Sequence, residues 1–179
     1  MQDKSDFRKK VLRVLSEGPA GDAVALWQAV EALPEFIAAS TVLIYWSMPS
    51  EVPTQAFIGR WCAGKRFVLP LVAGGSLVLK EYVPGRLEAG YRGIMEPTSE
   101  APEVCPEDID FAIVPGVAFD RNCMRMGRGK GFYDRLIPHL KCPLAGVCFP
   151  SQLFDRIPVD PWDRQLDMVV TENGIIKKR

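Results

Sequence analysis

The sequence predicts one α/β domain: a mostly parallel, Rossmann-like sheet flanked by helices, with a C-terminal hairpin. Short apolar segments rich in β-branched residues alternate with segments of helical period, the order typical of βαβ units. The centres of these apolar segments are hydrophobic throughout, as strands covered on both faces must be. No internal repeat or linker divides the 179 residues, so residues 1–179 are expected to fold as a single domain.

Two helices are expected at the N-terminus. Residues 4–17 carry an apolar stripe at helical spacing, and Asp22 is a suitable N-cap for a second helix that ends before Pro34. The positions expected to face inward are Phe7, Val11, Val14 and Leu15 in the first helix and Val24, Trp27 and Val30 in the second.

Residues 41–46 are β-branched, aromatic and almost wholly apolar, so they are expected to form a strand buried on both faces. Residues 84–108 are rich in proline, glycine and glutamate and indicate an irregular surface excursion. The turn signal Glu172-Asn173-Gly174 predicts the terminal hairpin. The other expected elements are strands at residues 66–69, 76–83, 111–114, 144–149, 168–171 and 175–177, and helices at residues 54–63 and 131–140.

The composition is that of an ordinary globular chain, with 47% hydrophobic and 25% charged residues. Lys+Arg and Asp+Glu are both 22. Without a basic excess, the chain is not expected to bind bulk nucleic acid or anionic membranes. No apolar run approaches the roughly 18 residues of a membrane helix. Five cysteines without a C-x-x-C pair indicate reduced thiols in a cytoplasmic protein, and the single histidine, His139, excludes a multi-histidine metal centre.

Residues 120–134 are the most informative segment, because alternating glycines follow a predicted strand and precede a predicted helix. Gly127, Gly129 and Gly131 let the backbone turn sharply and bring N–H groups close to a ligand. The charges around them come from Arg125, Arg128, Lys130 and Arg135. Backbone donors beside cations can bind a polyphosphate, and Asp134 could then hold Mg²⁺. A solvated surface turn is the alternative, since the spacing matches neither the Walker A loop nor the dinucleotide-binding fingerprint.

Five ordered segments together resemble the 5-formyltetrahydrofolate cyclo-ligase family, also called 5,10-methenyltetrahydrofolate synthetases. The glycine-rich loop, with Pro-Gly-Val-Ala-Phe-Asp followed by Arg-Met-Gly-Arg-Gly-Lys-Gly-Phe-Tyr-Asp, is similar to the family's signature. Two positions depart from that pattern. Cys123 replaces the usual glycine and is expected to alter only the tip of its turn, whereas Phe132 replaces the first of two tyrosines and lacks a hydroxyl group. The other matching segments are Lys4-x-x-x-Arg8, Ser47–Thr54, Gly93–Pro97 and Asp163–Asp167.

The resemblance implies an ATP-dependent ligase that converts 5-formyltetrahydrofolate to 5,10-methenyltetrahydrofolate and releases ADP and phosphate. In this reaction the formyl oxygen is phosphorylated and N10 then attacks the formyl carbon. The resemblance also implies that Asp134 and Asp163 are Mg²⁺ ligands, with Asp167 as a further candidate, and that Arg128 and Lys130 are catalytic. The implied nucleotide-binding residues are Lys4, Arg8, Arg125, Gly127, Arg128, Gly129, Lys130, Gly131, Phe132 and Tyr133.

Glu51 and Trp46 are the residues expected to bind the folate. They follow a predicted buried strand at its carboxyl end, where α/β sheets bind ligands. The Glu51 carboxylate can accept paired hydrogen bonds from a pterin, and it lies far in sequence from the loop where it would repel a triphosphate. The residues alone also allow plainer roles, with Trp46 and Tyr133 as core side chains and the pair of Lys4 and Arg8 as a solvated helix end.

Two other functions fit parts of the sequence. A relative of the sugar-phosphate isomerases or acyl-CoA transferases would bind phosphate on the same sheet but have no use for Lys4, Arg8 or the two aspartates. An RNA-binding module would use the Gly/Arg loop, which the neutral charge of the chain argues against. The expected partners are therefore the small molecules 5-formyltetrahydrofolate and ATP, with no nucleic acid or membrane partner, and the chain is expected to act as a monomer or weak homodimer.

Overall fold

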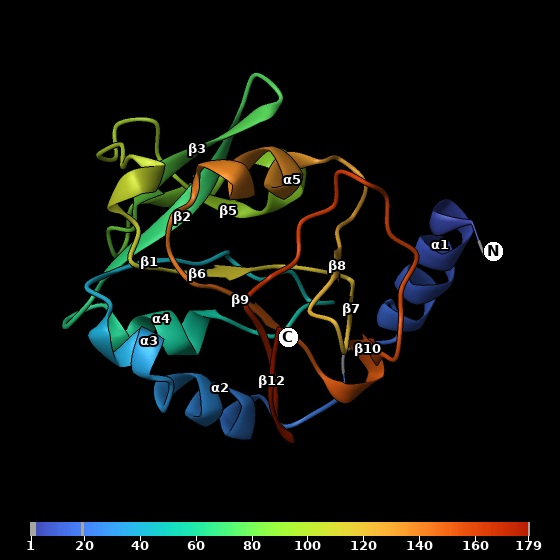
Figure 1. The fold of residues 1–179 in the computed structure, drawn as a ribbon. Coiled ribbons are helices and arrows are strands. Elements are labelled where there is room, and N and C mark those ends of the chain that lie inside the picture. The colour runs from blue at the N-terminus through green and yellow to red at the C-terminus, as the bar shows by residue number, and fades with distance from the viewer. Residues whose placement is uncertain (1–2, 19, 179) are drawn as a thin grey trace.

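A seven-stranded sheet with the order β12-β11-β9-β6-β1-β2-β3 organises the molecule. The structure is a computed structural model that describes residues 3–18 and 20–178 (Figure 1). The mostly parallel sheet and the terminal hairpin of β11 and β12 are both confirmed. The parallel strands are β1 (Thr41–Leu43), β2 (Arg66–Ala73), β6 (Phe111–Val114), β9 (Leu144–Val147) and β11 (Met168–Thr171), and the antiparallel edge strands are β3 (Ser76–Glu81) and β12 (Gly174–Lys177).

A second hairpin closes the other edge of the sheet, and the sequence analysis does not include it. β2 continues to Ala73, which pairs with Ser76 at the start of β3. The two residues between them, Gly74 and Gly75, have φ angles of 54° and 83°, the conformation that a two-residue hairpin turn requires. The Gly-Gly pair is therefore the local signal for this hairpin.

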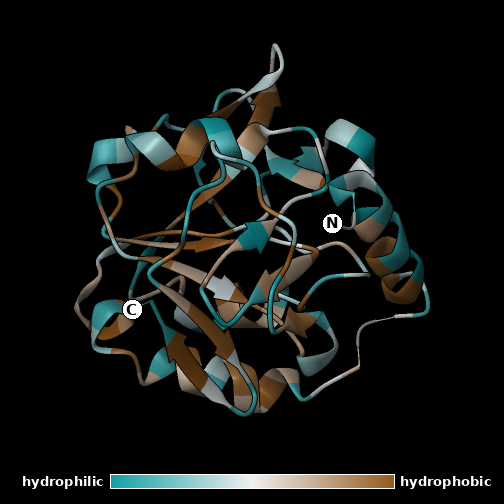
Figure 2. Cartoon of the chain, turned by 45° about the vertical axis from the view of Figure 1, so that its right-hand side comes forward, coloured by the Kyte–Doolittle hydropathy of each residue, from teal (hydrophilic) through white to brown (hydrophobic). Residues whose placement is uncertain are grey.

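Helices cover both faces of the sheet (Figure 1). α2 (Ala23–Glu31), α3 (Pro34–Ala38) and α4 (Gln55–Trp61) lie on one face, and α5 (Phe132–Leu136) with the 3-10 turn η3 (Ile137–His139) lies on the other. Neighbouring residues of β1 enter different cores: Val42 joins the cluster of α2–α4, and Leu43 joins the cluster of α5. In Figure 2 the hydrophobic colour is concentrated on the central strands and on parts of the helices. The expectation that the strand beginning at Thr41, here β1, is buried on both faces is confirmed.

α1 (Lys4–Leu15) packs on a separate three-stranded sheet with the order β10-β7-β8. Its side chains Val11 and Leu15 share a small core with Ala118, Met126 and Ile157. None of these three short strands is predicted from the sequence. They set α1 beside the loop that follows β8, at the right of Figure 1. The strands are β7 (Ala118–Asp120), β8 (Arg125–Met126) and β10 (Leu153–Phe154), and the 3-10 turn η4 (Pro150–Gln152) precedes β10.

Two of the positions predicted to face inward are wrong. Val14 and Val24 are 57% and 60% exposed, because α1 uses positions 7, 11 and 15 and α2 uses Leu26 instead. α2 ends before Pro34, as predicted, and Pro34 is also the first residue of α3. Proline is suited to the first position of a helix because it has no amide hydrogen to leave unbonded. No helix within the described residues is long and apolar enough to cross a membrane.

The segment 84–108 is more ordered than predicted. It contains β4 (Leu87–Ala89) and β5 (Met95–Pro97), which pair antiparallel around the 3-10 turn η1 (Tyr91–Gly93), and a further turn, η2 (Pro106–Asp108). Leu87 packs against one hydrophobic core and Val104 lies inside the other. The expectation of a wholly irregular surface excursion is therefore wrong, because buried apolar side chains hold the segment to the sheet.

Cys123 lies in the turn between β7 and β8, and its side chain enters the hydrophobic core. Its N–H group donates to the carbonyl of Asp120 (2.9 Å), closing the turn between β7 and β8, and its φ angle is 58°. Glycine suits such a left-handed position, which explains the usual family residue. Here the side chain is fully buried, with Sγ 3.5 Å from the carbonyl of Ile176. Burial raises the pKa of the thiol, so the group is held protonated.

Candidate active site

A cleft opens at the carboxyl ends of β1 and β6, between the glycine-rich loop and the β4–β5 hairpin. From the adjacent strands β1 and β6 the chain continues in opposite directions along the sheet, from β1 to β2 and from β6 to β9. Such a reversal of direction is where open α/β sheets bind ligands. About 1050 Å³ of space free of protein atoms lies between the walls of the cleft, including open solvent at the mouth.

The glycine-rich loop is joined to the start of α1. Arg8 Nε donates to the carbonyl of Gly127 (2.9 Å). A Cβ atom at Gly129 would lie 3.4 Å from the Arg8 guanidinium, and the φ of Gly129 is 96°. Gly131 is also left-handed, with φ of 68°. The structure therefore brings Arg8 to the loop, as the resemblance implies, and the loop needs glycine at both left-handed positions.

Arg128 and Glu51 meet in the cleft although 77 residues separate them. Arg128 Nε lies 3.4 Å from Glu51 Oε1, and its Nη2 donates to Ser50 Oγ (2.7 Å). The amide of Met48 donates to the second Glu51 oxygen (3.0 Å). Glu51 is only 7% exposed, and burial raises the pKa of its carboxyl while the Met48 amide and Arg128 oppose that rise. Glu51 is therefore distant from the loop in sequence but lies beside it in space.

Arg125 is held within the protein. It is 5% exposed, donates to the carbonyl of Pro115 (2.9 Å) and forms an ion pair with Asp134 (2.5 Å). Its guanidinium lies 5.7 Å from the centre of the Tyr133 ring. The Tyr133 hydroxyl is buried without a hydrogen-bond partner among the described residues, and burial raises its pKa. Since Tyr133 lines the cleft, this hydroxyl is a free polar group for a ligand.

Lys4 and Asp163 form the other paired group. Lys4 Nζ contacts Asp163 and lies 2.8 Å from Asp160 Oδ2, while the amide of Asp160 donates to Asp163 (2.7 Å). Asp167 lies elsewhere, because its carboxylate accepts from the amide of Leu144 (2.8 Å) and pairs with Lys178.

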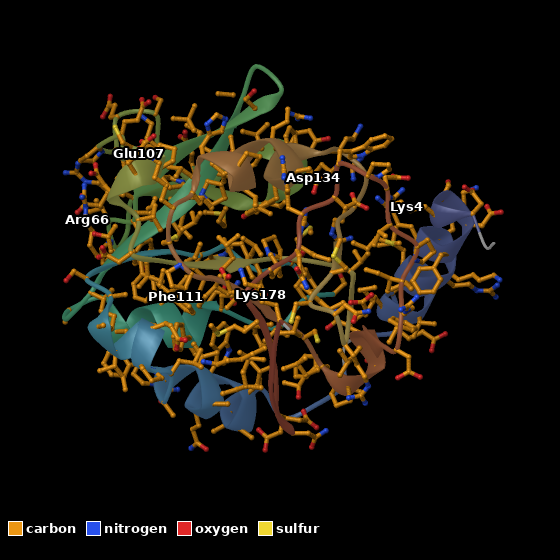
Figure 3. All side chains as sticks on the ribbon, viewed as in Figure 1. Lys4, Arg66, Glu107, Phe111, Asp134 and Lys178 are labelled. Carbon is orange, nitrogen blue, oxygen red and sulfur yellow. The ribbon has the colours of Figure 1, made fainter. Side chains whose placement is uncertain are left out.

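The carboxylates predicted to bind Mg²⁺ do not form a metal site by themselves. Asp134 and Asp163 are each neutralised by a cation. Asp134, in α5, pairs with Arg125, whereas Asp163 pairs with Lys4 at the start of α1 (Asp134 and Lys4 are labelled in Figure 3). The described residues contain no group of three or more histidine, cysteine or acidic side chains that could hold a metal. A resident divalent cation therefore does not fit these residues, and Mg²⁺ is treated below as part of the nucleotide substrate.

The remaining predicted residues lie along the walls of the cleft. Lys130 is exposed on its surface, and the Phe132 ring meets the Tyr91 ring edge to face (5.9 Å between centroids). Trp46 packs against the hydrophobic core on one side, 6.1 Å from the Tyr82 ring, and faces the cleft on the other. The core role and the ligand role weighed for Trp46 are thus compatible.

No role is predicted from the sequence for the hairpin wall of the cleft. Tyr91, Arg92 and Glu96 all line the cleft from this hairpin. The segment Gly93–Pro97 carries a family resemblance, but that resemblance gave no function to its side chains. Tyr45, which follows β1 and whose pKa burial raises, is a further residue that the sequence analysis missed.

The fold and the cleft define an α/β enzyme with cations and backbone donors gathered at the sheet's reversal point. A model of the 5-formyltetrahydrofolate cyclo-ligase family matches residues 1–172, and the chain belongs to this family.

Relatives and solved structures agree with this membership. The chain is 36% identical over 151 residues to the 5-formyltetrahydrofolate cyclo-ligase of Escherichia coli K12, covering 79% of this chain and 83% of the relative. It is 32% identical over 193 residues to that of Mycolicibacterium smegmatis, covering 99% and 98%. The structure of Aquifex aeolicus 5,10-methenyltetrahydrofolate synthetase matches with a TM-score of 0.88 and 37% identity, covering 98% of this chain and 93% of that one. The synthetase from Mycoplasma pneumoniae shares the fold, with a TM-score of 0.72 at 24% identity and coverage of 94% and 98%.

Proposed function

We propose that the cleft catalyses the ATP-dependent closure of 5-formyltetrahydrofolate to 5,10-methenyltetrahydrofolate, with release of ADP and phosphate. The observation that carries this proposal is the contact between Arg128 and Glu51. It places a cation of the loop suited to phosphate beside a buried carboxylate suited to a pterin. Transfer of a phosphoryl group from one substrate to the other requires such a shared site.

The chemistry explains why ATP is needed. The N5-formyl group is an amide, so its carbon is a poor electrophile and its oxygen a poor leaving group. Transfer of the γ-phosphoryl group to that oxygen creates an iminium phosphate. N10 attacks the same carbon and loses its proton, and phosphate then leaves with the original formyl oxygen. The attack is intramolecular, so the enzyme mainly positions the groups and stabilises charge.

The nucleotide side of the cleft is proposed to consist of α1 and the glycine-rich loop. Arg8 and the loop amides between Gly127 and Gly131 would bind the triphosphate, and Lys130 and Arg128 would face the transferred phosphoryl group. Lys4 would contribute by exchanging its aspartate partners for phosphate oxygens. This division is supported by the position of Arg8 against the loop.

The folate side is proposed to lie at the end of β1. Glu51 would accept hydrogen bonds from the amino and ring N–H groups of the pterin, with Trp46 as an apolar wall. The Tyr133 hydroxyl has no partner among the described residues, which supports a hydrogen bond from it to a ligand. Phe132 has no hydroxyl and can contact a ligand only through its ring. Arg125 would act by orienting Tyr133 and Asp134 and not as a mobile phosphate ligand, since both of its terminal nitrogens already donate, one to Pro115 and one to Asp134.

Mg²⁺ is proposed to arrive with ATP, coordinated mainly by phosphate oxygens and water. Asp163 would reach it when Lys4 turns toward the phosphates, whereas Asp134 would stay paired with Arg125. We also propose a single-domain protein that acts as a monomer or weak homodimer in the cytoplasm, without a nucleic acid or membrane partner. The five unpaired cysteines support a reducing compartment.

The direct test mixes the protein with 5-formyltetrahydrofolate and MgATP and follows the near-ultraviolet absorbance of the methenyl product. Product and ADP are expected to form in equal amounts. Omitting either 5-formyltetrahydrofolate or ATP should prevent the formation of both. Turnover of the folate without ATP, or no turnover by folded protein, would contradict the proposal. Salt-sensitive RNA binding without turnover would favour the RNA-binding alternative.

A further inference from the structure

The hairpin wall of the cleft carries a cation that the proposed mechanism does not use. Arg92 lies in η1, between β4 and β5, and lines the cleft opposite the glycine-rich loop. Of the other cleft cations, Arg125 and Arg128 have carboxylate partners, and Lys130 belongs to the proposed triphosphate site. Arg92 has no ion-pair partner within the described residues, so its guanidinium is available to an anionic ligand.

The backbone at Arg92 is strained and held in place. Its φ angle is 58°, a left-handed conformation that disfavours a side chain. The turn is fixed on both sides, because the amide of Gly90 donates to the carbonyl of Ile94 (2.8 Å) and a Cβ atom at Gly90 would lie 2.1 Å from the buried Glu96 carboxylate. Strain that the surroundings enforce is found at functional positions. The turn therefore presents Arg92 in a defined place.

An aromatic ring lies beside this guanidinium at the cleft. The Arg92 Cζ atom lies 5.5 Å from the centre of the Tyr91 ring. The same ring contacts Phe132 of the glycine-rich loop edge to face. Tyr91 and Phe132 thus form an aromatic edge between the two walls, with the exposed Arg92 beside it.

We propose that Arg92 binds a carboxylate of the glutamate tail of the folate. This inference rests on the proposed function, which places the pterin at Glu51. The p-aminobenzoyl ring of the folate would then pass the aromatic edge of Tyr91 and Phe132, and its glutamate would emerge at the mouth. A guanidinium matches a carboxylate with two parallel hydrogen bonds, a geometry that a lysine ammonium does not offer.

The test measures binding of two ligands to the free protein by calorimetry: 5-formyltetrahydrofolate, and a 5-formyltetrahydropterin that lacks the aminobenzoyl-glutamate tail. Arg92→Gly suits the left-handed backbone, so the variant keeps its fold. It is expected to lose about tenfold in affinity for the complete folate, corresponding to one or two lost hydrogen bonds to a carboxylate. Its affinity for the tail-less pterin should stay within about twofold. Arg92→Lys should recover only part of the loss.

Arg86→Ala is the matched control, because this exposed arginine lies just before β4 and does not line the cleft. It should bind both ligands as the wild type does. Equal loss of both ligands by Arg92→Gly, or a rise confined to the KM for MgATP, would overturn the tail assignment. Absence of methenyl product from the wild type would instead contradict the proposed function. An active wild type whose folate binding is unaffected by Arg92→Gly contradicts this inference alone.

Discussion

At the residue scale, charges in and beside the cleft are held in pairs, one of which joins the two predicted sites. Arg128 pairs with Glu51, and Lys4 pairs with Asp163. Burying a charge without a partner is costly, so these pairs keep the cations in place while no substrate is bound. Under the proposed function, substrate binding would exchange these internal partners for phosphate oxygens at the cations and for pterin N–H groups at Glu51.

Lys130 provides the most direct test of charge stabilisation. Lys130→Ala is expected to lower kcat by about one to three orders of magnitude, since a cation facing the phosphoryl group contributes about 2–4 kcal/mol in the transition state. Lys9→Ala is the control, because its ammonium lies exposed on α1 and its loss should leave kcat unchanged. Wild-type kcat in a folded Lys130→Ala protein would remove this residue from the mechanism.

Glu51→Gln tests which substrate the buried carboxylate serves. The change keeps the shape of the side chain but removes its charge, so the KM for 5-formyltetrahydrofolate is expected to rise about tenfold or more. The KM for MgATP should move less than about threefold, measured by separate titrations. Glu107→Gln, at an exposed position outside the cleft (Figure 3), is the control. A rise confined to MgATP would show that Glu51 serves the nucleotide.

Glu51→Gln is expected to stabilise the folded protein although it weakens the use of 5-formyltetrahydrofolate. Because burial raises the pKa of Glu51 above its unfolded value of 4.5, the folded state favours the protonated carboxyl. The carboxyl contributes its full stability below the unfolded pKa and loses it as the pH rises through the folded pKa. Urea unfolding at pH 8 should therefore find Glu51→Gln more stable than the wild type, with the difference shrinking toward pH 4. A constant difference across this range would contradict the assigned cause.

At the element scale, elements with a complete hydrophobic or capping pattern are the ones predicted from the sequence. The strand at residues 111–114 has the predicted bounds, and Asp22 caps α2 through the amides of Val24 and Ala25. The three strands of the small sheet have two or three residues each and depend on pairing with distant segments. No pattern within such short segments could indicate them.

The candidate site was predicted in part for the same reason. Family resemblance located the residues of the loop and of α1, but the Glu51–Arg128 contact depends on the packing of two loops. Arg92 was missed because its left-handed backbone and its place on the cleft wall are properties of the folded hairpin.

α1 offers a test of how one element supports the site. Leu15 is 3% exposed in the core beneath α1, so Leu15→Ala is expected to lower the free energy of unfolding by about 2–5 kcal/mol. Val14→Ala, on the exposed side of the same helix, should change it by less than about 0.5 kcal/mol. Because α1 carries Lys4 and Arg8, Leu15→Ala should also raise the KM for MgATP more than that for the folate. Equal destabilisation by the two variants would contradict the packing assigned to α1.

At the scale of the whole molecule, the loop after β1 and the glycine-rich loop meet in one cleft, and the start of α1 contacts the glycine-rich loop through Arg8. The chain has a formal net charge of zero, yet it gathers arginines and a lysine there. Within the described residues, carboxylates of the protein pair with Arg125 and Arg128 in the cleft and with Lys4 at the start of α1. The protein is therefore expected to respond to Mg²⁺ only through the nucleotide.

Thermal unfolding of the wild type tests this view of the metal. Mg²⁺ alone at millimolar concentration should shift Tm by less than about 1 °C, because Asp134 and Asp163 are neutralised by Arg125 and Lys4. MgATP at about 100 times its Kd should raise the free energy of unfolding by about 2.7 kcal/mol. For a chain of this size that corresponds to a rise in Tm of about 5–11 °C. ATP with a chelator should give a smaller rise, since the triphosphate then binds without its cation. A rise of several degrees with Mg²⁺ alone would reveal a resident metal site and contradict the proposal that the cation arrives with ATP.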